Sequence, residues 1–141
     1  MATVVTNLMV TDVEQSVGFY RDLLGFEVVT RVPAEGEVLG DNEPDQPLIF
    51  ANIKLGSGEL MLQCRESFSG EAPGVGVDDQ PSATASIYLR VEDLDRLIEA
   101  LGSAVIKQPK LSWYGMREVW AVDPDGYLLT LGEPSGQPPG A

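Results

Sequence analysis

The side chains that could do chemistry in this chain are few, because it contains no histidine and a single cysteine. Without an imidazole, no Ser/His/Asp arrangement can activate a nucleophile. Cys64 lies in an apolar stretch and has no histidine to serve as its base, so we expect a small core residue. Gly70, Gly74 and Gly76 lack the strand-to-helix context of a phosphate-binding loop. The sequence therefore identifies no catalytic residue.

Strand alternation predicts which polar groups could bind a ligand together, because successive side chains of a strand point to opposite faces of the sheet. One face is apolar and should meet the helices: Leu8, Val10, Ile87, Leu89, Val91, Leu129 and Leu131. The other, concave face carries Val5, Asn7, Met9, Ser86, Tyr88, Arg90, Leu128 and Thr130, with Met61 and Gln63 beside them and no carboxylate. Apolar surface with a few hydrogen-bonding groups is typical of a small-molecule pocket. The alternative is a filled sheet interior, but the polar members are too polar for a dry core.

Two aromatic residues, Trp113 and Tyr114, lie in a predicted loop over 108–116. They could stack on a flat ligand and shield it from water, or pack against the sheet edge or a second subunit. Trp120 lies on a strand, where we expect core or interface. We assign no functional role to Arg117 or Glu118 from the sequence.

The elements that position these residues form a duplicated pattern, in which residues 5–17 align without a gap with residues 86–98. Two such copies usually build one cavity between them. Strands are predicted at 4–10, 26–32, 48–55, 59–65, 85–91, 104–107, 117–122 and 127–132. Thr11 and Glu14 have capping-box spacing before a first helix that Gly25 stops, and Asp93 and Gly102 bound a second helix. The order is βαβββ, twice, in an α+β fold.

A single domain is predicted over residues 1–134, because 141 residues are enough to bury one core. Its modules span about 4–66 and 85–134, joined by a Pro/Gly/Asp-rich linker at 67–84, and a disordered tail follows at 135–141.

The charge balance excludes some partners, because nine basic and 22 acidic residues give a net charge of −13. That charge argues against nucleic acid and anionic membranes. Segments 33–47 and 66–82 carry acids and no base; we expect solvated loops, with attraction of a cationic ligand as the alternative. With no apolar run of membrane-spanning length and no signal-peptide pattern, we expect a cytoplasmic protein.

The motifs with the most specific pattern are TDVEQSVGFYRDLLGF at 11–26, VEDLD at 91–95 and REVWAVDPDGY at 117–127. With these motifs the chain resembles the vicinal oxygen chelate superfamily: glyoxalase I, extradiol dioxygenases, fosfomycin-modifying enzymes and bleomycin resistance proteins. The resemblance covers about residues 4–134. It implies two tandem βαβββ modules that form a curved mixed sheet around a cavity.

In metal-dependent members of that superfamily, each module supplies one ligand from its first strand and one from its last. The matching positions here are Val5, Met61 or Gln63, Ser86 and Thr130. None is a histidine or a carboxylate, and valine offers no lone pair. The resemblance therefore implies a site without a metal or cofactor.

The chain looks most like the metal-free branch typified by bleomycin resistance proteins. We expect a homodimer that sequesters a bulky aromatic or polycyclic natural product and so confers antibiotic resistance. The expected ligand-binding residues are Asn7, Met9, Met61, Gln63, Ser86, Tyr88, Arg90, Trp113, Tyr114 and Thr130. Because Arg90 faces the pocket, a neutral or weakly acidic ligand fits at least as well as a cationic one.

Two enzymatic alternatives stay open. The first is a metal-free isomerase, epimerase or lyase that uses Tyr88 or Arg90 on a developing oxyanion. The second, less favoured by the ligand positions, is a metal-dependent glyoxalase or dioxygenase.

Overall fold

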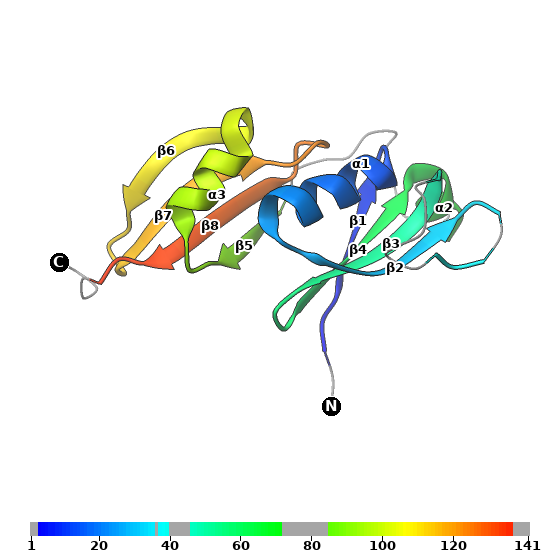
Figure 1. Cartoon of the computed structure of the whole chain (residues 1–141), viewed down its shortest axis with the longest axis horizontal. Helices are drawn as coiled ribbons and strands as arrows, with labels where there is room; N and C mark the ends of the chain where they lie inside the picture. Colours follow the sequence, from blue (N-terminus) through cyan, green and yellow to red (C-terminus); the bar gives the residue numbers. More distant parts are fainter. Residues whose placement is uncertain (1–2, 36, 40–45, 72–84, 137–141) are drawn as a thin grey trace. The chain divides into compact units, whose positions relative to one another are not determined.

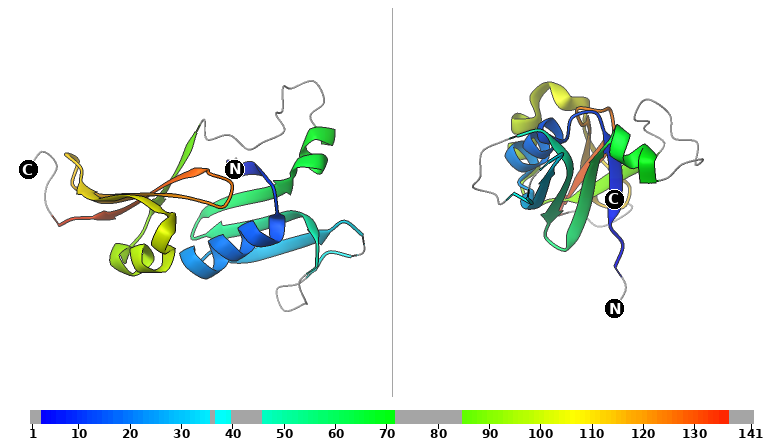
Figure 2. Two further views of the ribbon diagram at one scale, coloured as in Figure 1. Left: turned by 90° about the horizontal axis from the view of Figure 1, so that it is seen from above. Right: turned by 90° about the vertical axis from the view of Figure 1, so that its right-hand side faces the viewer.

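The computed structural model describes residues 3–35, 37–39, 46–71 and 85–136. These residues form two four-stranded mixed sheets with few helices, which confirms the predicted α+β class with two βαβββ modules (Figure 1). The chain divides into two compact units, residues 1–81 and 82–141, each with its own sheet. Figure 2 shows the helices and sheet of each unit from two further directions.

The first unit has the strand order β1-β4-β3-β2. Strand β1 (Thr6–Val10) runs parallel to β4 (Gly58–Cys64), while β3 (Leu48–Leu55) pairs antiparallel with β4 and with β2 (Glu27–Pro33). A two-residue turn joins β3 to β4, and Gly56 in it has a φ of 57°, which glycine adopts without steric cost.

Helix α1 (Val13–Gly18) covers one face of the first sheet and continues as a π-helical turn, η1 (Phe19–Leu23). The buried side chains of Val13, Val17 and Tyr20 form its apolar stripe. Asp12, not Thr11, is the N-cap, because its carboxylate accepts the Gln15 N–H at 3.0 Å. The predicted capping box is therefore wrong: the Glu14 carboxylate accepts the backbone N–H of Leu48.

The second unit repeats this arrangement with the strand order β5-β8-β7-β6. Its elements are β5 (Ser86–Arg90), α3 (Leu94–Leu101), η2 (Gly102–Ala104), β6 (Val105–Leu111), β7 (Met116–Val122) and β8 (Leu128–Pro134). The predicted helix signals are confirmed: Asp93 accepts the Arg96 N–H at 3.3 Å, and Gly102 ends the helix with a φ of 53°. The buried face of α3 packs against β8.

The predicted apolar face of each sheet is buried. Leu8 and Val10 are buried in the first unit, and Leu89, Leu129 and Leu131 in the second. Ile87 and Val91 are half-buried. Cys64 was expected in the core but is half-buried at the end of β4.

Two predicted boundaries are wrong. The start of the expected linker at 67–84 is helical, because α2 spans Arg65–Glu71, and residues 72–84 lie outside the described residues. The expected loop at 108–116 is mostly strand, because Lys110 and Leu111 of β6 pair with β7. Pro109 signals a break in the sequence, yet β6 is an edge strand, where proline is tolerated.

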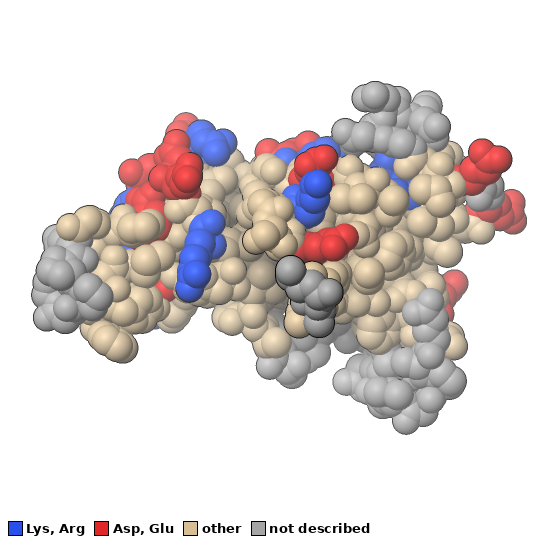
Figure 3. Space-filling model, turned by 90° about the horizontal axis from the view of Figure 1, so that it is seen from below, with Lys and Arg blue, Asp and Glu red and all other residues tan. Residues whose placement is uncertain are grey.

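Several expectations fall on residues that the structure does not describe. Of the acidic segments, Glu35, Glu37 and Glu66 are exposed, and the other carboxylates lie outside the described side chains. Of the predicted tail, Ser135 and Gly136 are described and 137–141 are not. Figure 3 shows acidic and basic groups interspersed on one face of the molecule, over a mostly uncharged surface.

Candidate functional site

A row of polar side chains joins β1, β4 and α2 on the first sheet, on the face opposite α1. Asn7 Nδ2 donates to Gln63 Oε1 at 2.8 Å, and Gln63 Nε2 donates to Ser67 Oγ at 2.8 Å. Gln63 is only 3% exposed, so these two bonds satisfy both ends of a buried amide. The sequence prediction missed Ser67, because it assigned the residue to the linker.

Two methionines lie beside this row. In the parallel register of β1 and β4, Met61 pairs with Asn7 and Met9 pairs with Gln63, so four predicted ligand residues share one face. Met9 is buried and Met61 is half-buried.

The strand register also distinguishes Met61 from Gln63, the two residues that the sequence left open for one of the four ligand positions. Thr6 pairs with Leu60 in the first sheet, as Ile87 pairs with Leu129 in the second. Because residues 5–17 align with 86–98, Met61 occupies the position equivalent to Thr130. Gln63 is then the equivalent of Gly132.

On the second sheet, the face opposite α3 is built from two rows of side chains that cross all four strands. The register places Tyr88, Thr130, Trp120 and Lys107 in one row, and Arg90, Gly132, Glu118 and Lys110 in the next. Ser86 continues the same face along β5, and it is exposed, as are Tyr88 and Arg90.

Glu118 is the centre of the polar contacts on this face. The hydroxyls of Tyr88 and Tyr114 both donate to its Oε2, each at 2.6 Å. Short bonds of this kind to an ionised carboxylate are among the stronger hydrogen bonds in proteins. The prediction that no carboxylate lies on the face is therefore wrong. The missed signal was the alternation of β7, which places Glu118 and Trp120 on the same side.

Both tyrosines keep their protons. Burial raises the pKa of Tyr88 well above the ordinary tyrosine value, and the hydrogen bond to Glu118 adds to the increase. For Tyr114, the hydrogen bond to Glu118 is the main cause of a raised pKa. Each phenol is therefore a neutral donor at neutral pH rather than a base.

Tyr88 reaches Glu118 across the intervening strand β8, and Gly132 leaves the path open. A Cβ atom at position 132 would lie 2.1 Å from Tyr88 Oη and 2.9 Å from Tyr88 Cζ. Contacts that close do not occur between non-bonded atoms, so any side chain at 132 would displace the phenol. The glycine allows a hydrogen bond between β5 and β7, strands that are not neighbours in the sheet.

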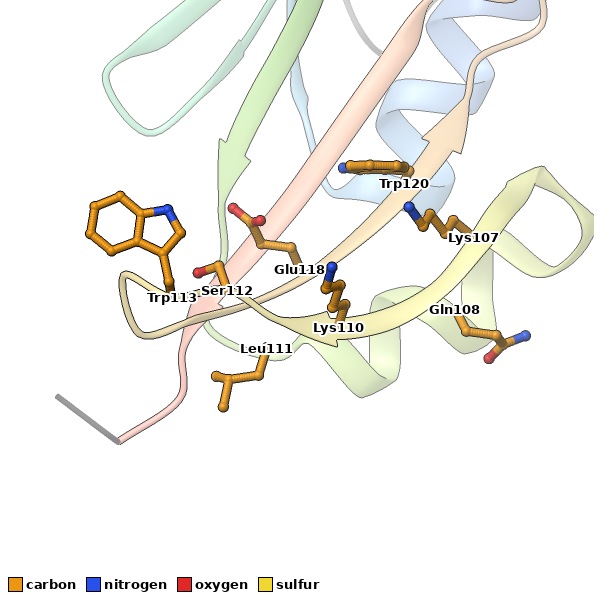
Figure 4. Close-up of a pocket in the computed structure, with 8 residues that line it drawn as sticks. All are labelled: Lys107, Gln108, Lys110, Leu111, Ser112, Trp113, Glu118 and Trp120. Carbon is orange, nitrogen blue, oxygen red and sulfur yellow. The ribbon is translucent and has the colours of Figure 1, made fainter. Parts of the chain in front are cut away.

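A groove of about 460 Å³ lies beside Glu118, within the size range of small-molecule pockets. Its lining residues come from β6, β7 and the turn between them (Figure 4): Lys107, Gln108, Lys110, Leu111, Ser112, Trp113, Glu118 and Trp120. Both tryptophans of the chain line it. Trp120 is 37% exposed, so of its two expected places the core is wrong, while an interface stays a prediction.

The predicted aromatic loop is a tight turn that presents Trp113 to the groove. The backbone N–H of Gly115 donates to the Ser112 carbonyl at 3.2 Å, and Gly115 has a φ of 85°, a conformation that favours glycine. The ring of Tyr114 meets that of Trp113 edge to face, with centroids 5.4 Å apart. Tyr114 is not one of the lining residues; through its bond to Glu118 it fixes one side of the turn.

Arg117 serves the opposite face of the sheet. Its guanidinium donates to Asp95 at 2.7 Å and to Glu133 at 3.1 Å, and Glu133 also accepts the Leu94 N–H at the start of α3. These contacts hold the helix to β7 and β8. Arg117 is therefore structural, while its neighbour Glu118 faces the groove.

The positions that match the metal ligands of vicinal oxygen chelate enzymes do not fit a divalent metal. Val5 has no donor atom, and the Ser86 and Thr130 hydroxyls and the Met61 thioether are weak ligands. Among the described residues, no three His, Cys, Asp or Glu side chains gather closely enough to hold an ion. None of the described helices has the length and apolar character needed to cross a membrane.

Comparison with known proteins identifies the family. The model of the Glyoxalase/Bleomycin resistance protein/Dioxygenase superfamily matches residues 3–131. Proteins named Bleomycin resistance protein from Geobacillus stearothermophilus and Staphylococcus aureus are 27% identical over 130 residues, which cover 88% of this chain and 90% of each relative.

Solved structures share the fold. TioX from Micromonospora sp. ML1 has a TM-score of 0.70 at 20% identity, covering 94% of this chain and 98% of that one. Hypothetical protein SA1046 from S. aureus has a TM-score of 0.69 at 22% identity, covering 94% of both chains. From the family match and the two βαβββ modules, this chain belongs to the Glyoxalase/Bleomycin resistance protein/Dioxygenase superfamily.

Proposed function

We propose that this protein binds an aromatic or polycyclic small molecule and sequesters it without chemical change. The observation that carries the proposal is the groove of about 460 Å³ lined by β6, β7 and the turn between them, where Trp113 and Trp120 supply flat apolar surface. An exposed tryptophan is a large apolar surface that a stacked ligand would remove from water. The name of the curated relatives, Bleomycin resistance protein, supports a role in drug resistance.

The expected affinity follows from the area that stacking would bury. A flat ring system stacked on the exposed indole surface of the groove buries on the order of 200–300 Å² of apolar surface, or about 5–7 kcal/mol before the cost of association. Hydrogen bonds to the groove would add orientation. Because about 5–7 kcal/mol corresponds to a Kd of about 0.2 mM to about 10 μM before that cost, we expect Kd values of about tens to hundreds of micromolar for a well-fitting ligand.

Within this proposal the two polar sites have different tasks. The Asn7–Gln63–Ser67 row has its amide groups satisfied by its own members, and we assign it to the stability of the first unit. The groove, with Tyr88 and Arg90 on the same sheet face, is assigned to the ligand. The sequence predicts that Asn7, Met9, Met61 and Gln63 contact the ligand; the assignment proposed here predicts instead that the ligand binds without them.

The experiment is a titration of polycyclic antibiotics and metabolites followed by tryptophan fluorescence, with recovery of the compound by mass spectrometry. We expect quenching that saturates at one ligand per groove and an unaltered compound afterwards. A Trp113→Ala variant, followed by calorimetry, separates groove binding from non-specific quenching. If no compound binds with a Kd below about millimolar, the proposal is wrong.

One observation supports a metal-free isomerase, epimerase or lyase as the second candidate. Tyr88 is neutral and carries one O–H, which donates to Glu118; turned from Glu118 to a substrate, that hydroxyl would stabilise a developing oxyanion. Arg90 lies on the same face. Recovery of an altered compound, with the alteration lost in Tyr88→Phe, would favour this candidate over sequestration.

Homodimer formation and a cytoplasmic location complete the proposal, and both come from resemblance and composition. Light scattering on the purified protein tests the first: a mass twice 15.2 kDa supports a dimer, and a mass of one chain contradicts it. Fractionation of producing cells tests the second.

A further inference from the structure

The groove-bearing face of the second sheet has a charge balance opposite to that of the chain. Its two rows contain three cations, Arg90, Lys107 and Lys110, and one anion, Glu118. The chain as a whole has nine basic and 22 acidic residues. Two of its three lysines therefore line a groove in a protein with a net charge of −13.

The one carboxylate of this face is already engaged. Glu118 accepts two tyrosine hydroxyls on a single oxygen, and these bonds hold it toward Tyr88 and Tyr114. Lys110 is exposed in the neighbouring position on β6 and forms no ion pair with any residue that the structure describes. Its ammonium group is therefore available to a ligand (Figure 4).

The other lysine occupies a place that a ligand ring would take. Lys107 Nζ lies 4.0 Å from the centroid of the Trp120 ring, a cation–π contact. A flat ligand stacking on that ring would move the ammonium to the ligand's edge. There it would meet a cationic substituent unfavourably and an anionic substituent favourably.

We propose that the groove selects flat aromatic ligands that carry an anionic group, such as an aromatic carboxylate. Trp113 and Trp120 contact the ring, and the ammonium groups of Lys107 and Lys110 hold the anion. This selectivity rests on the binding function proposed above and names its ligand class.

The test compares three compounds with one ring system and three charges: 2-naphthoate, 2-naphthylmethanol and 2-naphthylmethylammonium. Calorimetry gives the affinities, and the indole N–H resonances of the two tryptophans report where each compound binds. We expect the naphthoate to bind about tenfold more tightly than the alcohol, the ammonium compound to bind most weakly, and the differences to shrink as salt is raised.

Failure of this inference differs from failure of the binding function. If the alcohol or the ammonium compound binds as tightly as the naphthoate, the charge preference is overturned and the binding function stands. If none of the three binds or moves an indole resonance, both are overturned.

Substitution of a single lysine tests which ammonium group causes the preference for an anionic ligand. Lys110→Gln should weaken naphthoate binding about two- to fivefold and leave the affinity for the alcohol unchanged. Lys54→Gln is the matched control, because Lys54 lies on β3 of the first unit, 3.7 Å from Glu27. That control should leave all affinities unchanged. An equal loss for naphthoate and alcohol in Lys110→Gln would overturn the assignment.

Discussion

The two modules share one strand order but use an equivalent position in opposite ways. In the first sheet the position holds Gln63, whose amide accepts a hydrogen bond from Asn7 on the neighbouring strand. In the second sheet it holds Gly132, and Tyr88, the equivalent of Asn7, passes over it to Glu118 one strand further. Two changes together, the longer tyrosine in place of Asn7 and the missing side chain in place of Gln63, redirect the polar contact.

This difference changes what each face offers to a ligand. Gln63 is 3% exposed, and its row is tied to α2 through Ser67. In the second unit the polar contacts converge on Glu118, and the strands and turn beside it leave a groove lined by exposed tryptophans. A duplicated backbone therefore carries one face suited to stability and one suited to binding.

The largest expected effect comes from breaking the row in the first unit. Gln63→Ala removes a buried side chain and leaves the Asn7 and Ser67 groups without their partner. We expect the free energy of unfolding to fall by about 2–4 kcal/mol in urea denaturation. Ligand affinity of the folded protein should change less than about twofold. A large loss of affinity in the folded variant would mean that the row contacts the ligand.

The next-largest effect on stability is expected from placing a side chain at Gly132 in the second unit. In Gly132→Ala the new Cβ would clash with the Tyr88 phenol, which must leave Glu118. The phenol is the mobile end of a partly exposed side chain, so we expect a loss of about 1–2 kcal/mol in denaturation. Gly70→Ala is the comparison, because a Cβ atom at position 70 would have nothing within 4 Å of it; since Gly70 lies in α2, alanine there should leave stability unchanged or raise it by up to about 1 kcal/mol. Equal stability of the two variants would contradict a hydrogen bond from Tyr88 to Glu118 that passes over Gly132.

Truncation of Trp113, one of the two tryptophans that line the groove, should weaken ligand binding and leave stability unchanged. Trp113 is 76% exposed, so Trp113→Ala should alter the free energy of unfolding by less than about 0.5 kcal/mol. Its loss from the groove should raise Kd about tenfold in calorimetry. An unchanged Kd would show that Trp113 does not contribute to ligand binding.

The smallest effect concerns the titration of the tyrosines. The raised pKa values of Tyr88 and Tyr114 mean that the folded protein holds these protons more tightly than the unfolded chain. Their contribution to stability is therefore complete below about pH 10 and declines as pH rises through the folded-state values. In Glu118→Gln, the ultraviolet absorbance of tyrosinate should appear at lower pH than in the parent protein. An unchanged titration curve would contradict the two bonds to Glu118.

The elements of the fold were predictable because their signals are local. Asp93 as N-cap, Gly102 as helix stop and the strands around Gly56 each follow from a few neighbouring residues. Helix α2 was missed because Arg65–Glu71 has no apolar periodicity and contains Gly70. The end of β6 was misplaced because Pro109 reads as a break, and only the sheet order shows an edge strand.

The candidate site was only partly predictable, because its contacts join strands far apart in the sequence. Tyr88, Trp113 and Tyr114 were predicted from alternation and from an aromatic pair between strands; Trp113 lines the groove, and both tyrosines donate to Glu118. The alternation of β7 already placed Glu118 on this face and was missed, while its bond to Tyr88 depends on Gly132 and on the register of three strands. The same alternation places Trp120 on this face, outside the core.

The most direct test of the central claim is resonance mapping of a saturating aromatic ligand on the labelled protein. The account predicts large shifts at the indole N–H groups of Trp113 and Trp120, with the Gln63 side-chain amide unmoved. Shifts confined to Gln63 and its neighbours, with both indoles unmoved, would contradict it.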